Sequence, residues 1–320
     1  MSANPSNQEG FLSVLARREF CLTEGALIER IRRESSLPLD PQVANAALLY
    51  SAEGRALLLR LWREYLEIGR AHELGIVVGT PTWRANPERL AAAKLPPVAQ
   101  VASDAVALLA GLRASYGGYG RKVYLAGLMG CRGDAYAPQE SLDAAAAESF
   151  HQPQAEALAL AGVDFLLAAT LPACGEALGM ARAMAGTAKP YILSFVLRPD
   201  GTLLDGTPVA EAIDRIDRSA APAPAAYFAN CVHPSNCLRA LAAAEAMRPG
   251  TCRRLAGLQG NASAKTPEEL DDSSTLEADE PEPFAAAMLE LRRRFGTHIL
   301  GGCCGTNAAH IAAIASRCAG

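Results

Sequence analysis

Short apolar runs alternate along the chain with longer stretches rich in Ala and Leu, and this pattern repeats eight times. The short runs carry apolar residues at consecutive positions, which is typical of strands buried on both faces of a parallel sheet. The expected strands are Phe20–Thr23, Gly75–Gly79, Lys122–Ala126, Val163–Ala168, Tyr191–Val196, Ala225–Asn230, Leu255–Leu258 and His298–Leu300.

The stretches between these runs are long enough for crossover helices. Amphipathic patterns predict helices over Glu53–Leu74, Ser103–Tyr116, Glu140–Ala161 and Pro283–Phe295. Eight strand–helix units in one chain favour a closed (β/α)8 TIM barrel, while a doubly wound open sheet is the alternative that this pattern leaves open. Since no shift in composition marks a domain boundary, we expect residues 1–320 to form one barrel domain.

Two segments depart from this pattern. Met1–Gly10 is polar and is expected to be flexible, and Asn261–Pro283 is acidic and rich in Ser, Thr and Pro, which predicts a long surface loop. The N-terminus lacks the basic and apolar regions of a signal peptide. No stretch of about 18 apolar residues is free of charges, so no membrane span is expected. These features together predict a cytoplasmic protein.

The formal net charge of −4 gives no electrostatic reason to expect a nucleic acid as partner. The sequence leaves the oligomeric state open, a homo-oligomer included. Nine cysteines in a chain without a secretory signal argue for reduced thiols rather than a disulfide framework. Two of them, Cys303 and Cys304, are adjacent and follow the eighth expected strand, and Cys231 ends the sixth.

Active sites of such barrels lie at the carboxyl ends of the strands, so these three thiols would meet at one mouth. Glycines on both sides of Cys303 and Cys304 let the backbone turn so that both sulfurs face one metal ion. Three sulfurs with one open position are typical of a catalytic zinc site. Zn²⁺ deprotonates a bound thiol, which can then attack a methyl group at neutral pH. The competing interpretation is that buried cysteines serve as small hydrophobic side chains.

These residues resemble the homocysteine S-methyltransferase family of zinc-containing barrels, over nearly the whole chain. The most specific parts of the resemblance are Asn230-Cys231 and the run Gly301–Thr306. Further matches are His151–Gln154, Ala161–Asp164, Thr170, Pro172, Glu176, Ser194-Phe195 and Asp200–Thr207. The resemblance implies that Cys231, Cys303 and Cys304 bind Zn²⁺ and that the thiolate of the substrate is the fourth ligand.

The chain departs from the family at two positions. Family members that use homocysteine carry an acidic residue at the end of the first strand, and a Glu after the fourth strand that helps to hold the amino group. The matching residues here are Thr23 and Ala169. A buried cation without a partner is unfavourable, so this loss puts the acceptor in question unless another acid, Glu24 first, takes their place.

No catalytic residue is expected beyond the metal site, and the candidates for substrate binding are Glu24, Thr82, Trp83, Arg84, Thr170 and Asn230. Trp83 would stack on a cationic methyl donor, or it is a half-buried aromatic residue of the barrel. Arg84 would bind a carboxylate of donor or acceptor, or pair with Glu88. Asn230 would orient the Cys231 loop or hydrogen-bond the substrate.

Two further residues follow expected strands. Tyr136 would shape the donor pocket or simply belong to a loop. His233 lies two residues after Cys231, but three thiolates already complete the protein ligands, so it is expected outside the metal shell. The remaining cysteines are expected to be packing or surface thiols.

Three functions are compatible with these observations. The first is zinc-dependent transfer of a methyl group from an onium donor, S-methylmethionine or S-adenosylmethionine, to homocysteine, giving methionine. The second is the same chemistry on a different thiol or selenol acceptor. The third is a non-catalytic zinc-binding barrel that acts as a sensor or partner protein. The three expected ligands and the open position favour the first two, in which both partners of the protein are small molecules.

Overall fold

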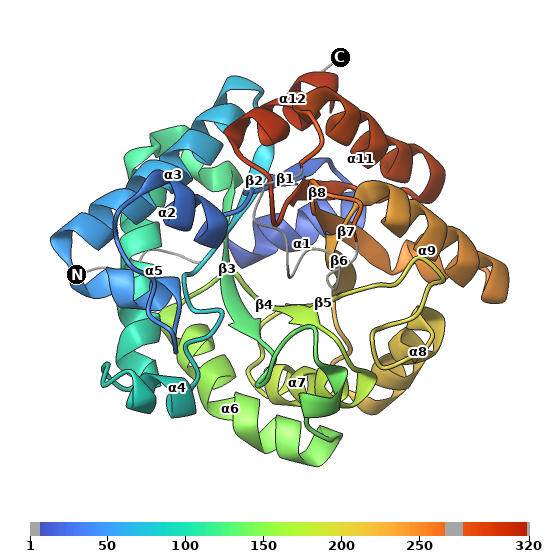
Figure 1. The fold of residues 1–320 in the computed structure, drawn as a ribbon, viewed down its shortest axis with the longest axis horizontal. Helices are drawn as coiled ribbons and strands as arrows, with labels where there is room; N and C mark the ends of the chain where they lie inside the picture. Colours follow the sequence, from blue (N-terminus) through green and yellow to red (C-terminus); the bar gives the residue numbers. More distant parts are fainter. Residues whose placement is uncertain (1–6, 266–277, 319–320) are drawn as a thin grey trace.

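The computed structural model describes residues 7–265 and 278–318. Eight parallel strands follow one another around a closed barrel, in which β8 pairs with β1 (Figure 1). They are β1 (Cys21–Thr23), β2 (Gly75–Gly79), β3 (Val123–Gly130), β4 (Phe165–Leu171), β5 (Tyr191–Phe195), β6 (Ala226–Val232), β7 (Leu255–Gly260) and β8 (Ile299–Gly302). The predicted (β/α)8 barrel is therefore confirmed, and the open sheet is excluded because its edge strands would not pair.

Helices surround the strands as a ring (Figure 1). They are α1 (Gln8–Arg17), α2 (Ile28–Glu34), α3 (Ala52–Ala71), α4 (Pro87–Ala92), α5 (Val98–Ser115), α6 (Ala144–Ala161), α7 (Cys174–Ala185), α8 (Val209–Ser219), α9 (Pro234–Met247), α11 (Pro281–Phe295) and α12 (Ala308–Cys318). Short 3-10 helices are η1 (Asn45–Tyr50), η2 (Gly117–Lys122), η3 (Pro138–Glu140) and η4 (Thr251–Arg253). The predicted helices correspond to α3, α5, α6 and α11. Two starts differ: α5 begins at Val98 instead of Ser103, and α6 begins at Ala144 instead of Glu140. Asp143 caps α6 by accepting hydrogen bonds from the backbone N–H groups of the first turn.

Side chains on the strands alternate between the barrel interior and the surrounding helices, as the pleat of a strand requires. Cys21 and Val77 belong to the cluster of buried side chains inside the barrel. Leu22, Ile76 and Val78 pack in the layer between strands and helices. This alternation decides which residues at the strand ends face the mouth of the barrel.

The amino-terminal end of the barrel is closed by α1, which is seen behind the strands in Figure 1. Phe11 of α1 is fully buried, and its ring stacks on that of Phe165 with centroids 3.8 Å apart. The Tyr124 ring lies 5.6 Å from Phe11 on another side. The helix thus fills the end of the barrel opposite to the carboxyl ends of the strands.

The two segments singled out in the sequence lie only partly in the described residues. Of the segment expected to be flexible, residues 1–6 lie outside them, and Gln8–Gly10 form the start of α1. Of the expected acidic loop, residues 266–277 lie outside them, and Pro281–Pro283 begin α11. Within the described ranges, no helix combines the length and the apolar character needed to cross a membrane.

Candidate metal centre

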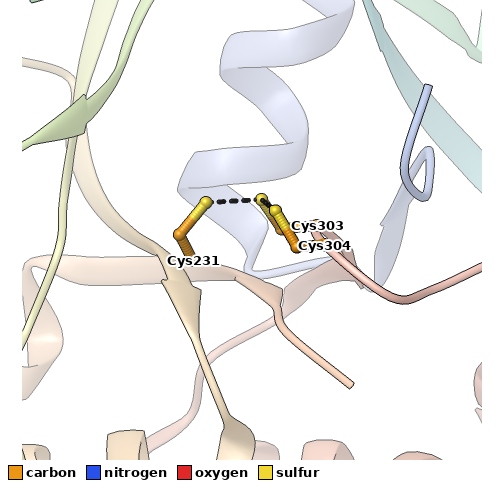
Figure 2. A group of neighbouring side chains, drawn as sticks. All are labelled: Cys231, Cys303 and Cys304. Carbon is orange, nitrogen blue, oxygen red and sulfur yellow. Dashed lines mark hydrogen bonds between the residues drawn. The ribbon is translucent and has the colours of Figure 1, made fainter. Parts of the chain in front are cut away.

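The carboxyl ends of β6 and β8 bring Cys231, Cys303 and Cys304 together (Figure 2). The Sγ atom of Cys231 lies 2.6 Å from that of Cys303, and the Sγ atoms of Cys303 and Cys304 are 4.0 Å apart. All three sulfurs lie within 4.8 Å of one another. Cys231 is buried and the other two are half-buried. The described residues thus contain a group of three thiols that can hold a metal ion.

The backbone at Cys231 directs its side chain towards the other two cysteines. β6 does not end at Asn230 or Cys231 but continues to Val232, and its register with β7 shifts between Asn230 and Val232. Cys231 has a φ of 53°, in the left-handed region that costs a residue with a Cβ of order 1–3 kcal/mol. Such a bulge re-aims a side chain, so the strain is located at one of the three clustered cysteines.

Close packing holds the loop that carries Cys303 and Cys304. A Cβ atom on Gly301 would overlap the Thr23 hydroxyl, and one on Gly302 would overlap the Thr306 hydroxyl. The Thr306 hydroxyl donates a hydrogen bond of 2.7 Å to the carbonyl oxygen of Cys303. Glycine is therefore required at Gly301 for the chain to pack against Thr23 of β1, and at Gly302 for it to pack against Thr306.

Asn230 connects the Cys231 bulge to β4 and β5. Its Oδ1 accepts hydrogen bonds from the backbone N–H of Thr170 (2.8 Å) and from the Ser194 hydroxyl (2.7 Å). Its Nδ2 donates to the Thr170 hydroxyl (2.8 Å) and to the Cys231 sulfur (3.4 Å). An amide side chain has two donor and two acceptor positions, and here protein groups use all of them. Of the two roles expected for Asn230, the geometry supports the orientation of Cys231.

Hydrogen bonds to Cys231 favour its thiolate. The bond with Cys303 is the largest of the effects that lower the pKa of the Cys231 thiol well below its ordinary value, and Cys304, Tyr136 and Asn230 act in the same direction. Burial acts in the opposite direction. The same contacts with Cys231 raise the pKa of the Cys303 and Cys304 thiols well above their ordinary values. The negative charge of the group is therefore favoured on Cys231, and the thiolate is the form in which a cysteine binds a metal ion.

Tyr136, on the loop after β3, is within hydrogen-bonding reach of Cys231. The base of this loop is held by Glu176, whose carboxylate accepts from the backbone N–H of Arg132 (2.7 Å) and bonds to Nε2 of His151 (2.9 Å). The Glu176 and His151 side chains are fully buried. The loop that carries Tyr136 is thus anchored to α6 and α7 next to the cysteines.

The three thiols suit zinc. Zinc–sulfur bonds of about 2.3 Å in tetrahedral geometry place sulfurs about 3.8 Å apart, between the 2.6 Å and 4.0 Å found here. Small rotations of the side chains would surround an ion. Thiolates favour zinc over magnesium or calcium, and three protein ligands leave one tetrahedral position for an outside ligand.

Trp83 and Arg84 lie at the ends of β3 and β4. The indole N–H of Trp83 is 3.4 Å from the carbonyl oxygen of Ala169, and a Cβ on Gly130 would lie 2.5 Å from the same nitrogen. The Arg84 guanidinium lies 4.7 Å from the centre of the Trp83 ring. The cation over this ring is therefore Arg84. The carboxylate of Glu88 pairs with Arg132 instead of Arg84.

Thr82 and Glu24 are buried among protein partners. The Thr82 hydroxyl bonds to the Thr80 hydroxyl (2.7 Å) and to the carbonyl oxygen of Leu128 (2.7 Å). Glu24 Oε1 accepts from the backbone N–H of Gly79 (2.9 Å), and its side chain also interacts with Trp62 of α3. Following the alternation along β1, Glu24 faces the helix layer and Thr23 faces the interior. Burial raises the pKa of Glu24 to about 8.

Neither ring nitrogen of His233 is available for the metal. Nε2 pairs with Asp279 (2.9 Å) and Nδ1 bonds to the Ser235 hydroxyl (2.7 Å). Two residues that support the cysteine loops were not predicted from the sequence to do so. Ser194 bonds to Asn230, and the Glu29 carboxylate accepts from the backbone N–H of Gly305. Ser194 was visible in the sequence as a polar residue in an apolar strand, whereas nothing in the sequence pointed to Glu29.

Comparisons with known proteins point to one family. The sequence model of the family described as Homocysteine S-methyltransferase matches residues 21–318. A homocysteine S-methyltransferase of Escherichia coli (strain K12) is 32% identical over 208 residues, which are 63% of this chain and 61% of that protein. The matched part thus spans less than two thirds of the curated relative.

Solved structures of the E. coli homocysteine methyltransferase MmuM share the fold. An oxidized and a metallated form each superpose with a TM-score of 0.77 at 23% identity, over 96% of this chain and 99% of theirs. An apo form gives a TM-score of 0.68 at 22% identity, over 95% of this chain and 98% of that one. With a family match over almost its entire length and three convergent cysteines at the barrel mouth, the chain is an enzyme of the homocysteine S-methyltransferase family.

Proposed function

We propose that this chain is a zinc-dependent S-methyltransferase that moves a methyl group from an onium donor to a small-molecule thiol. The observation that supports this most is the set of three cysteine sulfurs within 4.8 Å of one another at the carboxyl end of the barrel. Zinc, when bound, lowers the pKa of the acceptor thiol so that it reacts as the thiolate at neutral pH.

The residues of the chain would hold and orient the reacting groups. Cys231, Cys303 and Cys304 would bind the ion. The Asn230 amide fixes the direction of the Cys231 sulfur, and the Glu29 carboxylate fixes the turn after Cys304 through the N–H of Gly305. Groups that orient metal ligands in this way tune the affinity of a site and align the reactants.

Methyl transfer needs little proton chemistry. The acceptor loses its proton to solvent on binding, and its sulfur forms a bond to the methyl carbon of the donor. The carbon–sulfur bond of the donor breaks and leaves its electron pair on the donor sulfur, which departs as a neutral thioether. No general acid is required, which agrees with the expectation of no catalytic residue beyond the metal site. S-methylmethionine and S-adenosylmethionine are the donors that we propose.

Homocysteine is the first acceptor to test, because the curated relative carries its name. The zinc-loaded protein is incubated with each donor, labelled with deuterium in the methyl group, and with homocysteine or a panel of other thiols. Mass spectrometry then measures labelled thioether products, and metal analysis measures zinc per chain. Labelled product on any thiol, dependent on zinc, supports the proposal. One zinc per chain with no transfer from either donor to any thiol would contradict it and favour a sensor.

A further inference from the structure

The β2–α4 loop presents a guanidinium on an aromatic platform at the mouth of the barrel. The Trp83 ring lies over Gly130, which is the register partner of Ala169 at the ends of β3 and β4. Thr170, the next residue, bonds to the amide that orients Cys231. The Arg84 guanidinium stacks on the Trp83 ring. Stacking uses the face of a guanidinium and leaves its N–H edges available for an anion.

Arg84 belongs to a group of positive charges. Burial and the charge of Arg84 lower the pKa of Arg89, and Arg132 acts on Arg89 in the same direction. Arg89 donates to backbone carbonyl oxygens, and Arg132 pairs with Glu88. Arg84 forms no ion pair within residues 7–265 and 278–318. Among these residues, neither Arg84 nor Arg89 pairs with a carboxylate, but Arg89 is held by backbone carbonyl oxygens, so in this group the guanidinium left for an outside anion is the one over Trp83.

The buried carboxylates at the same end of the barrel face the surrounding helices. Glu24 faces α3, where its Oε1 accepts from the Gly79 N–H and its Oε2 is buried without a hydrogen-bond partner among the described residues. Glu176 is buried with His151. Asp205 accepts from the backbone N–H groups of Cys174 and Thr207, and Asp279 pairs with His233.

Other carboxylates at this end are half-buried or exposed. Glu29 binds the Gly305 N–H. Asp134 is exposed and accepts from the Tyr136 N–H, and an exposed charge attracts a cation weakly, with about 1 kcal/mol at most. Among the described residues, the two buried carboxylates at this end, Glu24 and Glu176, thus face the helices, and an ammonium group inside the barrel would meet neither.

The interior positions next to the cysteines carry no charge either. Ala169 presents a methyl group inside the barrel. Thr23 faces the same interior, and its hydroxyl donates to the Glu24 carbonyl oxygen (3.1 Å). The interior thus offers an apolar wall to the body of a thiol, and Arg84 stands on the rim.

We propose, resting on the proposed function above, that the preferred acceptor is a thiol with a carboxylate and without an ammonium group, and that Arg84 binds the carboxylate. The methyl transfer itself is unchanged: the acceptor sulfur gains the methyl group, and the donor sulfur keeps the electron pair. What changes is how the acceptor is recognised, by one guanidinium on an indole ring.

Three acceptors of matched length test this. Homocysteine has both charged groups, 4-mercaptobutanoate has only the carboxylate and 3-aminopropanethiol has only the ammonium group. Calorimetry of the zinc-loaded protein without donor gives the dissociation constant of each thiol at pH 7.5, and methylation with S-methylmethionine gives kcat/KM. We expect 4-mercaptobutanoate to equal or exceed homocysteine in both. 3-aminopropanethiol should be weaker by about 10-fold or more, because it lacks a charge-assisted hydrogen bond to Arg84.

Arg84→Gln tests the residue. It should weaken 4-mercaptobutanoate by about 10-fold and leave 3-aminopropanethiol within about 2-fold. Arg121→Gln, on an exposed arginine before β3 at the opposite end of the barrel, is the matched control and should change neither. Two results would overturn this inference and leave the proposed function standing. One is a dissociation constant or kcat/KM for homocysteine that is more than about 10-fold better than that for 4-mercaptobutanoate. The other is an equal effect of Arg84→Gln on all three thiols. A zinc-loaded protein that binds no thiol would overturn the proposed function and the inference with it.

Discussion

Thr170 and Cys231 both have left-handed backbone, with φ of 62° and 53°, and the side-chain amide of Asn230 bonds to both. A register shift between Ala168 and Leu171 of β4 spans Thr170, and one between Asn230 and Val232 of β6 spans Cys231. Two strained bulges on strands that are not neighbours are therefore joined by one side chain. The position of the Cys231 thiol depends on a contact with β4 as well as on its own strand.

Asn230→Ala should reduce zinc affinity by about 10- to 100-fold, since it removes a group that orients a metal ligand. It also leaves the Thr170 N–H and the Ser194 hydroxyl without their acceptor, at about 1–3 kcal/mol of stability. Chelator competition measures the affinity, and thermal unfolding measures the stability. Asn230→Asp keeps the acceptor oxygen but loses the donor to Cys231. If it binds zinc as well as the unchanged protein, the bond to the sulfur has no role.

Cys303→Ser should lower zinc content and methyl transfer together, because it replaces the soft sulfur next to that of Cys231 by a hydroxyl oxygen, which binds zinc less well. Metal analysis and product formation are measured on the same sample, before and after treatment with a chelator. Cys318→Ser, on the half-buried thiol of α12, is the control and should keep both. Full methyl transfer by a zinc-free Cys303→Ser protein is the result that would end the zinc mechanism.

Gly130→Ala should displace Trp83 without removing the metal. The added Cβ would lie 2.5 Å from the indole nitrogen and 2.8 Å from the Trp83 carbonyl oxygen, so the β2–α4 loop must move. We expect unchanged zinc content, a shifted Trp83 fluorescence in a Trp62→Phe background, and a kcat/KM reduced by about 10-fold or more through lost alignment. Gly111→Ala is the control, since its Cβ would meet nothing within 4 Å. Unchanged fluorescence and activity would show that Trp83 does not depend on Gly130.

Glu24→Gln should change how stability depends on pH. The folded chain raises the pKa of Glu24 from 4.5 to about 8, so between these values it binds a proton that the unfolded chain releases. The stability that protonated Glu24 contributes is therefore full below pH 4.5 and is lost as the pH rises through about 8.

Glutamine stays neutral at every pH. The variant should match the unchanged protein at pH 5 and exceed it at pH 8.5 by about 1–3 kcal/mol, or a few °C in Tm. Differential scanning fluorimetry at both pH values measures this, with Glu148→Gln, an exposed carboxylate of α6, as control. A difference between variant and unchanged protein that stays constant with pH would mean that Glu24 is ionised in the folded state.

The barrel could be predicted from the sequence because its strands are apolar on both faces, and all eight runs are strands. Their carboxyl ends were harder to predict. β4 continues to Leu171 and β6 to Val232, beyond the expected ends at Ala168 and Asn230. Both extensions run through a bulge, where polar residues interrupt the apolar pattern and backbone strain replaces regular pairing.

The three cysteines could be predicted as one site because barrel topology places the ends of all strands at one mouth. The partners of Asn230 could not be predicted. Thr170 is 60 residues away in the sequence, and only the register of the strands in the barrel brings it next to Asn230. The position of Glu24 could have been predicted from the alternation of side chains along a strand. Thr23 faces the barrel interior, so Glu24, the next residue, faces the helices. The structure places Glu24 beside Trp62 of α3.

The stacked Phe11 and Phe165 rings restrict access to the three cysteines to one side of the molecule. With α1 filling the opposite end of the described barrel, the site can be reached only from the carboxyl ends of the strands. Under the proposed reaction, donor, acceptor and both products therefore share one entrance.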